Sequence, residues 1–163
     1  MSPSPADPAR RTPAASRVVM TELVLPADTN NYGHIFGGRL LALADKCSAM
    51  AAMRHCRLPV VTASFDRVDF LRPVKAGMMV ILTAELTAAF TTSMEVAVTV
   101  EAEDPVSAVR VRTCRALITV VAIDPTGRPS PVPPLELETP EERARAERAA
   151  KRREHRVRTR DEF

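Results

Sequence analysis

The stretch from Gly37 to about Cys56 constrains the fold of this chain more than any other part. After a glycine pair the sequence reads RLLALADKCSAMAAMRHC, which is dominated by Leu, Ala and Met and contains no β-branched residue. This composition favours a helix, and Pro59 prevents the helix from continuing. The stretch is apolar on nearly every side, so the helix is expected to be wrapped by another element rather than to lie on a surface.

Runs of β-branched and apolar residues on both sides of this helix can do the wrapping. The predicted strands are residues 18–25, 60–71, 78–90, 93–103 and 109–123, and residues 93–103 alternate most clearly between apolar and polar side chains. Tight turns between the later strands favour antiparallel pairing. The expected fold class is α+β: one long central helix wrapped by a curved antiparallel sheet of about five strands, plus a charged C-terminal helix. Such a sheet covers one side of its helix and leaves edges, which favours a dimer or a larger assembly.

The 163 residues divide into three parts. Residues 1–16 are rich in Pro, Ala and Ser, and we expect a disordered leader. Residues 17–129 hold the helix and the strands and form one domain. Residues 130–163 combine a Pro-rich linker with a helix that starts after Thr139, a good N-cap. That helix is charged almost all round, so we expect a solvated, fraying tail; a docking arm, or a role toward nucleic acid or membrane, is the alternative.

Composition excludes several classes of function. The net charge of +3 suits an anionic substrate but is too weak to indicate nucleic acid. No apolar stretch is long enough to span a membrane, so no membrane partner is expected. No secretory signal is visible, and the three cysteines, Cys47, Cys56 and Cys114, follow no metal spacing. An odd number of cysteines without a signal indicates reduced thiols in a cytoplasmic protein.

The start of the central helix is the first candidate for chemistry. A helix that begins at Gly37 and Gly38 presents free backbone N–H groups and the positive end of a dipole, and glycines let a ligand come close to the main chain. Such a terminus can hold an anion or a carbonyl oxygen that gains negative charge. Asp45 lies about two turns further along this apolar helix, where a carboxylate is costly unless it is paired or functional. Pairing with Lys46 or with backbone groups and a functional role are equally favoured by the residues alone.

The loop before the helix adds further polar residues: Asp28, Asn30, Asn31 and His34. Asn and Asp commonly make local hydrogen bonds in turns, and we expect most of these residues to do only that. His34 can titrate near neutral pH, but a lone loop histidine is more often idle. The cysteines have no evident basic partner, and no nucleophile elbow, phosphate-binding loop or dinucleotide fingerprint is present.

The combined motif LPADTNNYGHIFGG, from Leu25 to Gly38, followed by Leu-Ala-Asp45, resembles the hotdog-fold acyl-CoA thioesterases. Within them the chain is similar to the cytosolic or brain acyl-CoA hydrolase and YciA-like group. The resemblance covers about Val18 to Pro129 and includes the Phe70-Leu71-Arg72-Pro73 and Thr91-Thr92-Ser93 segments. It implies a helix enclosed by a sheet, which matches the predicted element order, and active sites that form between two protomers.

The resemblance also implies roles for particular residues. Asp45 corresponds to the catalytic Asp, acting as general base or nucleophile, and Asn30 of the opposite subunit orients water or the carbonyl. The backbone N–H of Gly37 corresponds to the donor to the thioester oxygen. Relatives often carry Asp or Asn where this chain has His34, which leaves His34 a secondary catalytic candidate. No cofactor is expected beyond coenzyme A as part of the substrate.

Coenzyme A carries phosphates, so cations and hydroxyl groups are expected along its path. The candidate substrate-binding residues are Phe36, Gly38, Thr62, Ser64, Arg67, Arg72, Lys75, Thr91, Thr92 and Ser93. The main rival is a hotdog module that binds or senses acyl-CoA without cleaving it. A hydratase or dehydratase on the same fold is a weaker rival, because its Asp-x-Asn-Pro-x-His type of motif is missing from the sequence. The sequence leaves open the acyl length and whether the assembly is a dimer, tetramer or hexamer.

Overall fold

The computed structural model describes residues 11–160, and these form five strands, two long helices and two short helical turns. In chain order they are α1 (Pro13–Ser16), β1 (Val18–Leu23), η1 (Pro26–Asp28), α2 (Gly37–Cys56), β2 (Val60–Phe70), β3 (Met79–Ala89), β4 (Ser93–Glu103), β5 (Arg110–Ala122) and α3 (Pro140–Arg158). The predicted α+β class, the central helix and its bounds, and the five antiparallel strands are confirmed, with strand ends that differ by two residues at most.

The strands form one antiparallel sheet in the order β1-β3-β4-β5-β2, so β1 and β2 are its edges. β2 pairs with β5 through two bulges, at Thr62/Ser64 and Phe65/Arg67. Bulges bend a strand and increase its twist, which curves this edge of the sheet around the helix. Apolar side chains remain exposed along and just beyond β2, namely Val61, Phe65, Phe70 and Leu71.

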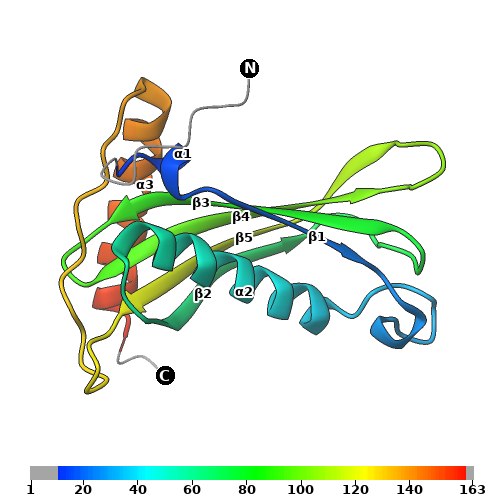
Figure 1. Ribbon diagram of the computed structural model, residues 1–163, viewed down its shortest axis with the longest axis horizontal. Helices are drawn as coiled ribbons and strands as arrows, with labels where there is room; N and C mark the ends of the chain where they lie inside the picture. The colour runs from blue at the N-terminus through cyan, green and yellow to red at the C-terminus, as the bar shows by residue number, and fades with distance from the viewer. Residues whose placement is uncertain (1–10, 161–163) are drawn as a thin grey trace.

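The core lies between α2 and the face of the sheet that α2 covers (Figure 1). Alternate residues of β4, from Met94 to Ala102, are buried toward the helix, and α2 contributes Leu40, Leu43, Cys47 and Ala51. Aliphatic side chains fill this layer, as the low aromatic content of 4% requires. The face that carries α2 is called the inner face below, and the opposite face is called the outer face.

The C-terminal helix does not behave as the expected solvated, fraying tail. α3 packs behind the sheet, on the outer face, near the C-terminal end of α2 (Figure 1). Ala149 is fully buried there, while Arg152 and Arg156 bond to Glu95 and Asp66 of the sheet. The prediction failed because the outward-facing carboxylates of the strands supply partners that the helix sequence alone cannot show. The capping box at Thr139 and Glu142 confirms the predicted start of α3.

The predicted leader also differs in part from the structure. Residues 1–10 lie outside the described residues. Residues 13–16 form α1 rather than disordered chain, with Thr12 as N-cap and with both Thr12 and Ser16 buried. Within residues 11–160, neither long helix is apolar enough over a sufficient length to cross a membrane.

Candidate active site

The N-terminal end of α2 presents backbone donors with no partner of their own. The N-cap residue is Phe36, whose side chain makes no capping hydrogen bond, and its carbonyl accepts from Arg39 and Leu40. Within residues 11–160, the N–H groups of Gly37 and Gly38 have no acceptor. They sit at the positive end of a 20-residue helix, which makes them suited to an oxygen that carries negative charge.

The two glycines serve different purposes. A Cβ atom on Gly37 would lie 3.2 Å from Cζ of Phe70, so the aromatic ring would have to move by a few tenths of an ångström to admit a side chain. A Cβ atom on Gly38 would meet nothing within 4 Å, and this residue is exposed. Gly37 therefore lets Phe70 cover one side of the helix start, while Gly38 leaves the main chain open to a ligand. Phe70 was missed as a site residue because its contact with Gly37 depends on the pairing of β2.

The loop before α2 is shaped by Asn30. Its Oδ1 accepts hydrogen bonds from the N–H groups of Tyr32 (3.0 Å) and His34 (3.2 Å), which is the local turn role expected for most of these loop residues. The Nδ2 group of Asn30 has no partner within residues 11–160 and stays available as a donor. His34 pairs with Lys75 through its backbone, whereas its imidazole has no partner within those residues. Asn30 therefore holds the loop and also offers a polar group beside the helix start.

An ion pair that the sequence did not reveal fixes the loop to the helix. Arg39 Nε lies 2.9 Å from Oδ1 of Asp28, and Oδ2 of Asp28 accepts from the N–H of Leu25. Both carboxylate oxygens are thereby occupied, so Asp28 is a structural residue. The buried side chain of Ile35 and its backbone bond to Val74 hold the other end of the loop.

Asp45 projects from α2 toward the edge strand β2. Thr62 Oγ1 donates to Asp45 Oδ1 at 2.5 Å, and Oδ2 has no partner within residues 11–160. The side chain is half-buried, and Lys46 points to solvent instead of pairing with it. Pairing with Lys46, one of the structural roles left open by the sequence, is therefore wrong. A carboxylate fixed through one oxygen, with the other oxygen free, is arranged to accept a proton from a nearby group.

Asp45 and the helix start lie too far apart to act on one carbonyl within a single chain. Eight residues separate Gly37 from Asp45, which corresponds to about 12 Å along the helix axis. A carbonyl carbon and its oxygen need the base and the oxyanion donor within a few ångströms. Thr62, the partner of Asp45, lies on the edge strand β2, which also exposes the apolar side chains Val61 and Phe65.

The remaining candidate residues fall in three places. Arg72 follows β2 and Lys75 pairs with His34, so both lie near the start of α2. Ser64 and Arg67 lie on the outer face, where they bond to Asp66 and Asp69. Thr91, Thr92 and Ser93 form the β3–β4 turn at the opposite end of the sheet, beside the C-terminal end of α2. One chain therefore brings Asn30, His34, Phe36, Gly37, Gly38, Arg72 and Lys75 to one end, and it keeps the other candidates apart from them.

The cysteines are not nucleophiles. All three are buried, and burial raises the pKa of the Cys47 thiol to about 11. Burial raises the pKa of Cys56 and Cys114 as well. The reactive form of a cysteine is the thiolate, so these groups stay inert near neutral pH. Within residues 11–160, no three His, Cys, Asp or Glu side chains gather as metal ligands.

Comparisons with known proteins give the family of the chain. Residues 32–109 match the thioesterase superfamily. The chain is 43% identical over 127 residues to YkhA of Bacillus subtilis, an uncharacterized acyl-CoA thioester hydrolase, covering 78% of this chain and 74% of the relative. It also matches the cytosolic acyl coenzyme A thioester hydrolases of mouse, rat and human at 35% identity, but it spans only 38% of their length.

Solved structures show the same fold. A hexameric acyl-CoA thioesterase, solved in the apo state, superposes with a TM-score of 0.86 at 41% identity, covering 92% of this chain and 96% of its own. The acyl-CoA hydrolase of Staphylococcus aureus, in complex with butyryl coenzyme A and coenzyme A, gives 0.85 at 35% identity, covering 94% and 93%. Further structures of the Staphylococcus enzyme carry alanine in place of an aspartate, a threonine or an asparagine.

Proposed function

This chain belongs to the thioesterase superfamily, and we propose that it hydrolyses acyl-coenzyme A thioesters to free fatty acid and coenzyme A. The observation that carries the proposal is the Asp45 carboxylate, which Thr62 holds through Oδ1 and which keeps Oδ2 free. The relatives described above are named acyl-CoA thioester hydrolases, hydrolases or thioesterases, and these names support the same substrate class.

In the proposed reaction, Oδ2 of Asp45 takes a proton from water while the water oxygen attacks the thioester carbonyl carbon. The N–H of Gly37 donates to the oxyanion that forms, and Asn30 Nδ2 orients the water or the carbonyl. The carbon–sulfur bond then breaks and coenzyme A leaves as a thiolate. A thiol has a pKa of about 8.5, so it departs without a strong acid. Attack by Asp45 itself, through an anhydride that water then cleaves, uses the same groups.

The site is proposed to be shared between two copies of the chain, with Asp45 from one and with Asn30 and Gly37 from the other. The separation of about 12 Å along α2 supports this arrangement. So does the edge strand β2, which exposes Val61, Phe65 and Phe70 and has unpaired backbone groups on one side. We infer a homo-oligomer built from such dimers; one superposed relative is hexameric.

Three residue types in this chain match those altered in the solved Staphylococcus variants. An aspartate, a threonine and an asparagine were replaced there, and Asp45, Thr62 and Asn30 are the corresponding types in the site proposed here. For the coenzyme A phosphates, Arg72 and Lys75 remain our candidates, since both lie beside the helix start. The mammalian relatives named cytosolic support a cytoplasmic location.

The test is the Asp45→Asn variant, assayed by free-thiol release on a panel of acyl-CoAs from short to long chain. General-base catalysis typically contributes a factor of about 10² to 10⁴, so kcat should fall by that amount on every substrate that the parent cleaves. Asp104→Asn, at the β4–β5 turn, removes one carboxylate whose hydrogen bonds stay within its own turn, and it should keep the parent kcat.

Two results would contradict the proposal. Parent-level kcat in folded Asp45→Asn would remove Asp45 from the reaction. A parent protein that binds acyl-CoA and releases it intact across the whole panel would identify a binding module instead of an enzyme.

A further inference from the structure

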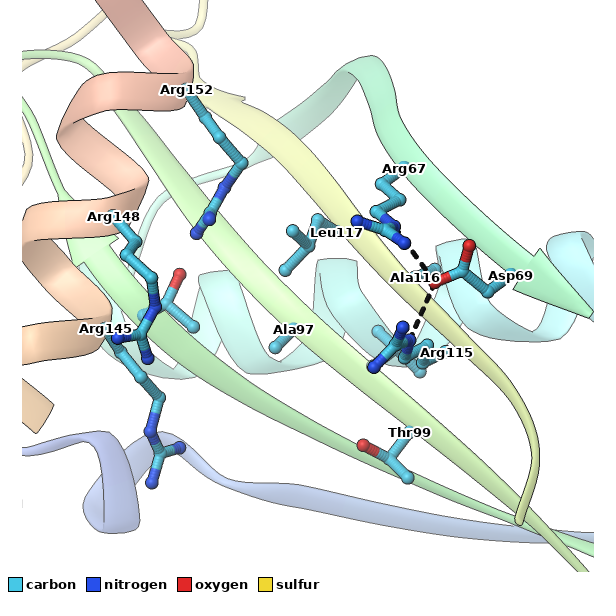
Figure 2. A pocket seen from close by; sticks show the side chains of 12 residues that line it. Arg67, Asp69, Ala97, Thr99, Arg115, Ala116, Leu117, Arg145, Arg148 and Arg152 are labelled. Carbon is cyan, nitrogen blue, oxygen red and sulfur yellow. Dashed lines mark hydrogen bonds and ion pairs between the residues drawn. The ribbon is translucent and has the colours of Figure 1, made fainter. Parts of the chain in front are cut away.

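A cavity lies on the outer face, between α3 and the sheet. Its volume is about 370 Å³, which is within the range of small-molecule sites, about 300–1,000 Å³. Figure 2 shows Arg145, Arg148 and Arg152 of α3 on one side of it, and Arg67, Arg115 and Asp69 of β2 and β5 on the other. This cavity is called the outer-face pocket below.

The outer-face pocket gathers more positive charge than its carboxylates can balance. Asp69 accepts from both Arg67 (2.9 Å) and Arg115 (2.7 Å), and these hydrogen bonds hold its pKa below the usual range. Glu95 pairs with Arg152, and Glu85 pairs with Arg145. Arg148 has no carboxylate or hydrogen-bond partner within residues 11–160. Five guanidinium groups thus face three carboxylates, and like charges held this close favour a bound anion.

The floor of the outer-face pocket is made of small and aliphatic side chains from the central strands. Ala97 and Leu117 form this floor between the two arginine walls, as Figure 2 shows. Thr99 adds a hydroxyl group at the same level. A ligand can therefore rest on an apolar floor while its charged groups reach arginines on both sides.

The outer-face pocket is separate from the proposed thioester site. Leu117 and Arg115 alternate along β5 with Ala116 and Ile118, which are buried. Asp45 and Thr62 meet on the inner side, where α2 lies. The full thickness of the sheet stands between the two places.

We propose that the outer-face pocket binds a phosphate-bearing anion. Arginine presents its N–H groups in a planar fork that matches phosphate oxygens, and pairs of this kind are the strong hydrogen bonds of proteins. A group with two or three linked phosphates carries enough oxygens to accept from arginines on both walls, the unpaired Arg148 and the free guanidinium N–H groups of Arg115 among them. The ligand bridges α3 to the sheet and so stabilises the docked helix.

The proposal is tested by titrating the full-length protein with inorganic triphosphate, using calorimetry and the melting temperature as readouts. Triphosphate should bind and raise Tm. A charge-assisted hydrogen bond contributes enough that Arg148→Gln should weaken binding about tenfold or more. Arg115→Gln, on the opposite wall, should do the same, since Arg67 still neutralises Asp69. Arg143→Gln is the matched control: it removes the same charge from the same helix outside the pocket and should change the affinity less than about twofold.

An equal loss of affinity in Arg143→Gln and Arg148→Gln would overturn the proposal, because it would show attraction to net charge alone. Lack of binding to the parent protein at low salt would also overturn it. If coenzyme A displaces triphosphate and the KM for acyl-CoA rises in Arg148→Gln, the phosphates are those of the substrate. If neither happens, the ligand is a separate phosphate compound. Thiol release by the parent reports on the proposed thioesterase activity independently of these titrations.

Discussion

The inner and outer faces of this sheet hold their helices by different forces, although the same strands supply both. Along β4, Met94, Val96 and Val98 point to α2 and are at most 1% exposed. Glu95 alternates with them and meets Arg152 of α3 on the other side. Burial of aliphatic surface is strong but has no direction, whereas ion pairs are directional and depend on geometry. The inner face should therefore determine the stability of the fold, whereas the outer face should determine the position of α3.

The largest difference between the faces is expected in the loss of unfolding free energy when either of two neighbouring residues of β5 is replaced by alanine. Ile118 is fully buried against the inner layer, while Leu117 is half-buried in the outer-face pocket. Ile118→Ala should lower the free energy of unfolding by about 3 kcal/mol, because it removes buried methyl groups and leaves a cavity. Leu117→Ala should cost about 1 kcal/mol. Urea unfolding of the two variants measures this, and equal losses would mean that both faces are packed alike.

The next effect concerns the ion pairs that hold α3. Glu95 has a side chain only 2% exposed and receives two hydrogen bonds from Arg152. Arg152→Ala leaves this carboxylate unpaired and should cost about 2–3 kcal/mol, less than the 3–5 of a fully enclosed pair, because undocking of α3 can hydrate Glu95. Arg145→Ala breaks a more exposed pair with Glu85 and should cost less than 1 kcal/mol.

Hydrogen exchange of α3 amides, followed together with urea unfolding, separates undocking from global unfolding. Arg152→Ala should speed exchange in α3 and leave α2 protected. Faster exchange in both helices would show that α3 and the core unfold as one unit.

The inner layer could be predicted from the sequence because each of its signals is local. The composition of residues 37–56 predicted the central helix, and the alternation in residues 93–103 indicated a strand, so that the α+β fold class followed. The outer layer could not be predicted in the same way. The charges of α3 find partners on Glu85, Glu95 and Asp66, about 60 to 90 positions away in the chain, and only the folded sheet places them side by side.

In the candidate site, too, the features that are local in the sequence could be predicted, whereas the contacts made by folding could not. The glycine pair and Asp45 stand out locally, as a helix start and as a charge in an apolar helix. Thr62 was a candidate for substrate binding, but its hydrogen bond to Asp45 could not be predicted, because that bond depends on where the folded sheet places β2 beside α2. Arg67 lies on the outer face, where it pairs with Asp69, and the two bulges of β2 exchange the faces of Ser64 and Phe65 relative to a regular strand. Bulges depend on pairing with β5 and leave little trace in the sequence.

A smaller effect is expected at the contact between Thr62 and Asp45. Thr62→Val keeps the shape of the side chain and removes the hydroxyl that donates to Asp45 Oδ1. The carboxylate then loses its fixed orientation, and kcat should fall about tenfold, equivalent to about 1.4 kcal/mol. Thr83→Val, on β3, is the matched control and should keep the parent kcat. Both variants should unfold within about 1 kcal/mol of the parent, so a kcat loss that follows a loss of stability would argue against a role in orientation.

The smallest effect probes the linker that joins the two faces. His55, near the end of α2, is buried, and its Nε2 lies 2.9 Å from the carbonyl of Pro133 in the linker to α3. Its Nδ1 is buried without a partner within residues 11–160, and burial lowers the pKa of the imidazole below its usual 6.5.

A histidine whose folded pKa is lowered stabilises the protein above the unfolded pKa, and that contribution is lost as pH falls toward the folded pKa. From about pH 6.5 downward, the free energy of unfolding should fall by at most about 1.4 kcal/mol per pH unit from this group. In His55→Gln, which can still donate to Pro133, urea unfolding at pH 7.5 and pH 5.5 should show a smaller loss than in the parent. The same loss in both proteins would assign the pH dependence to other groups.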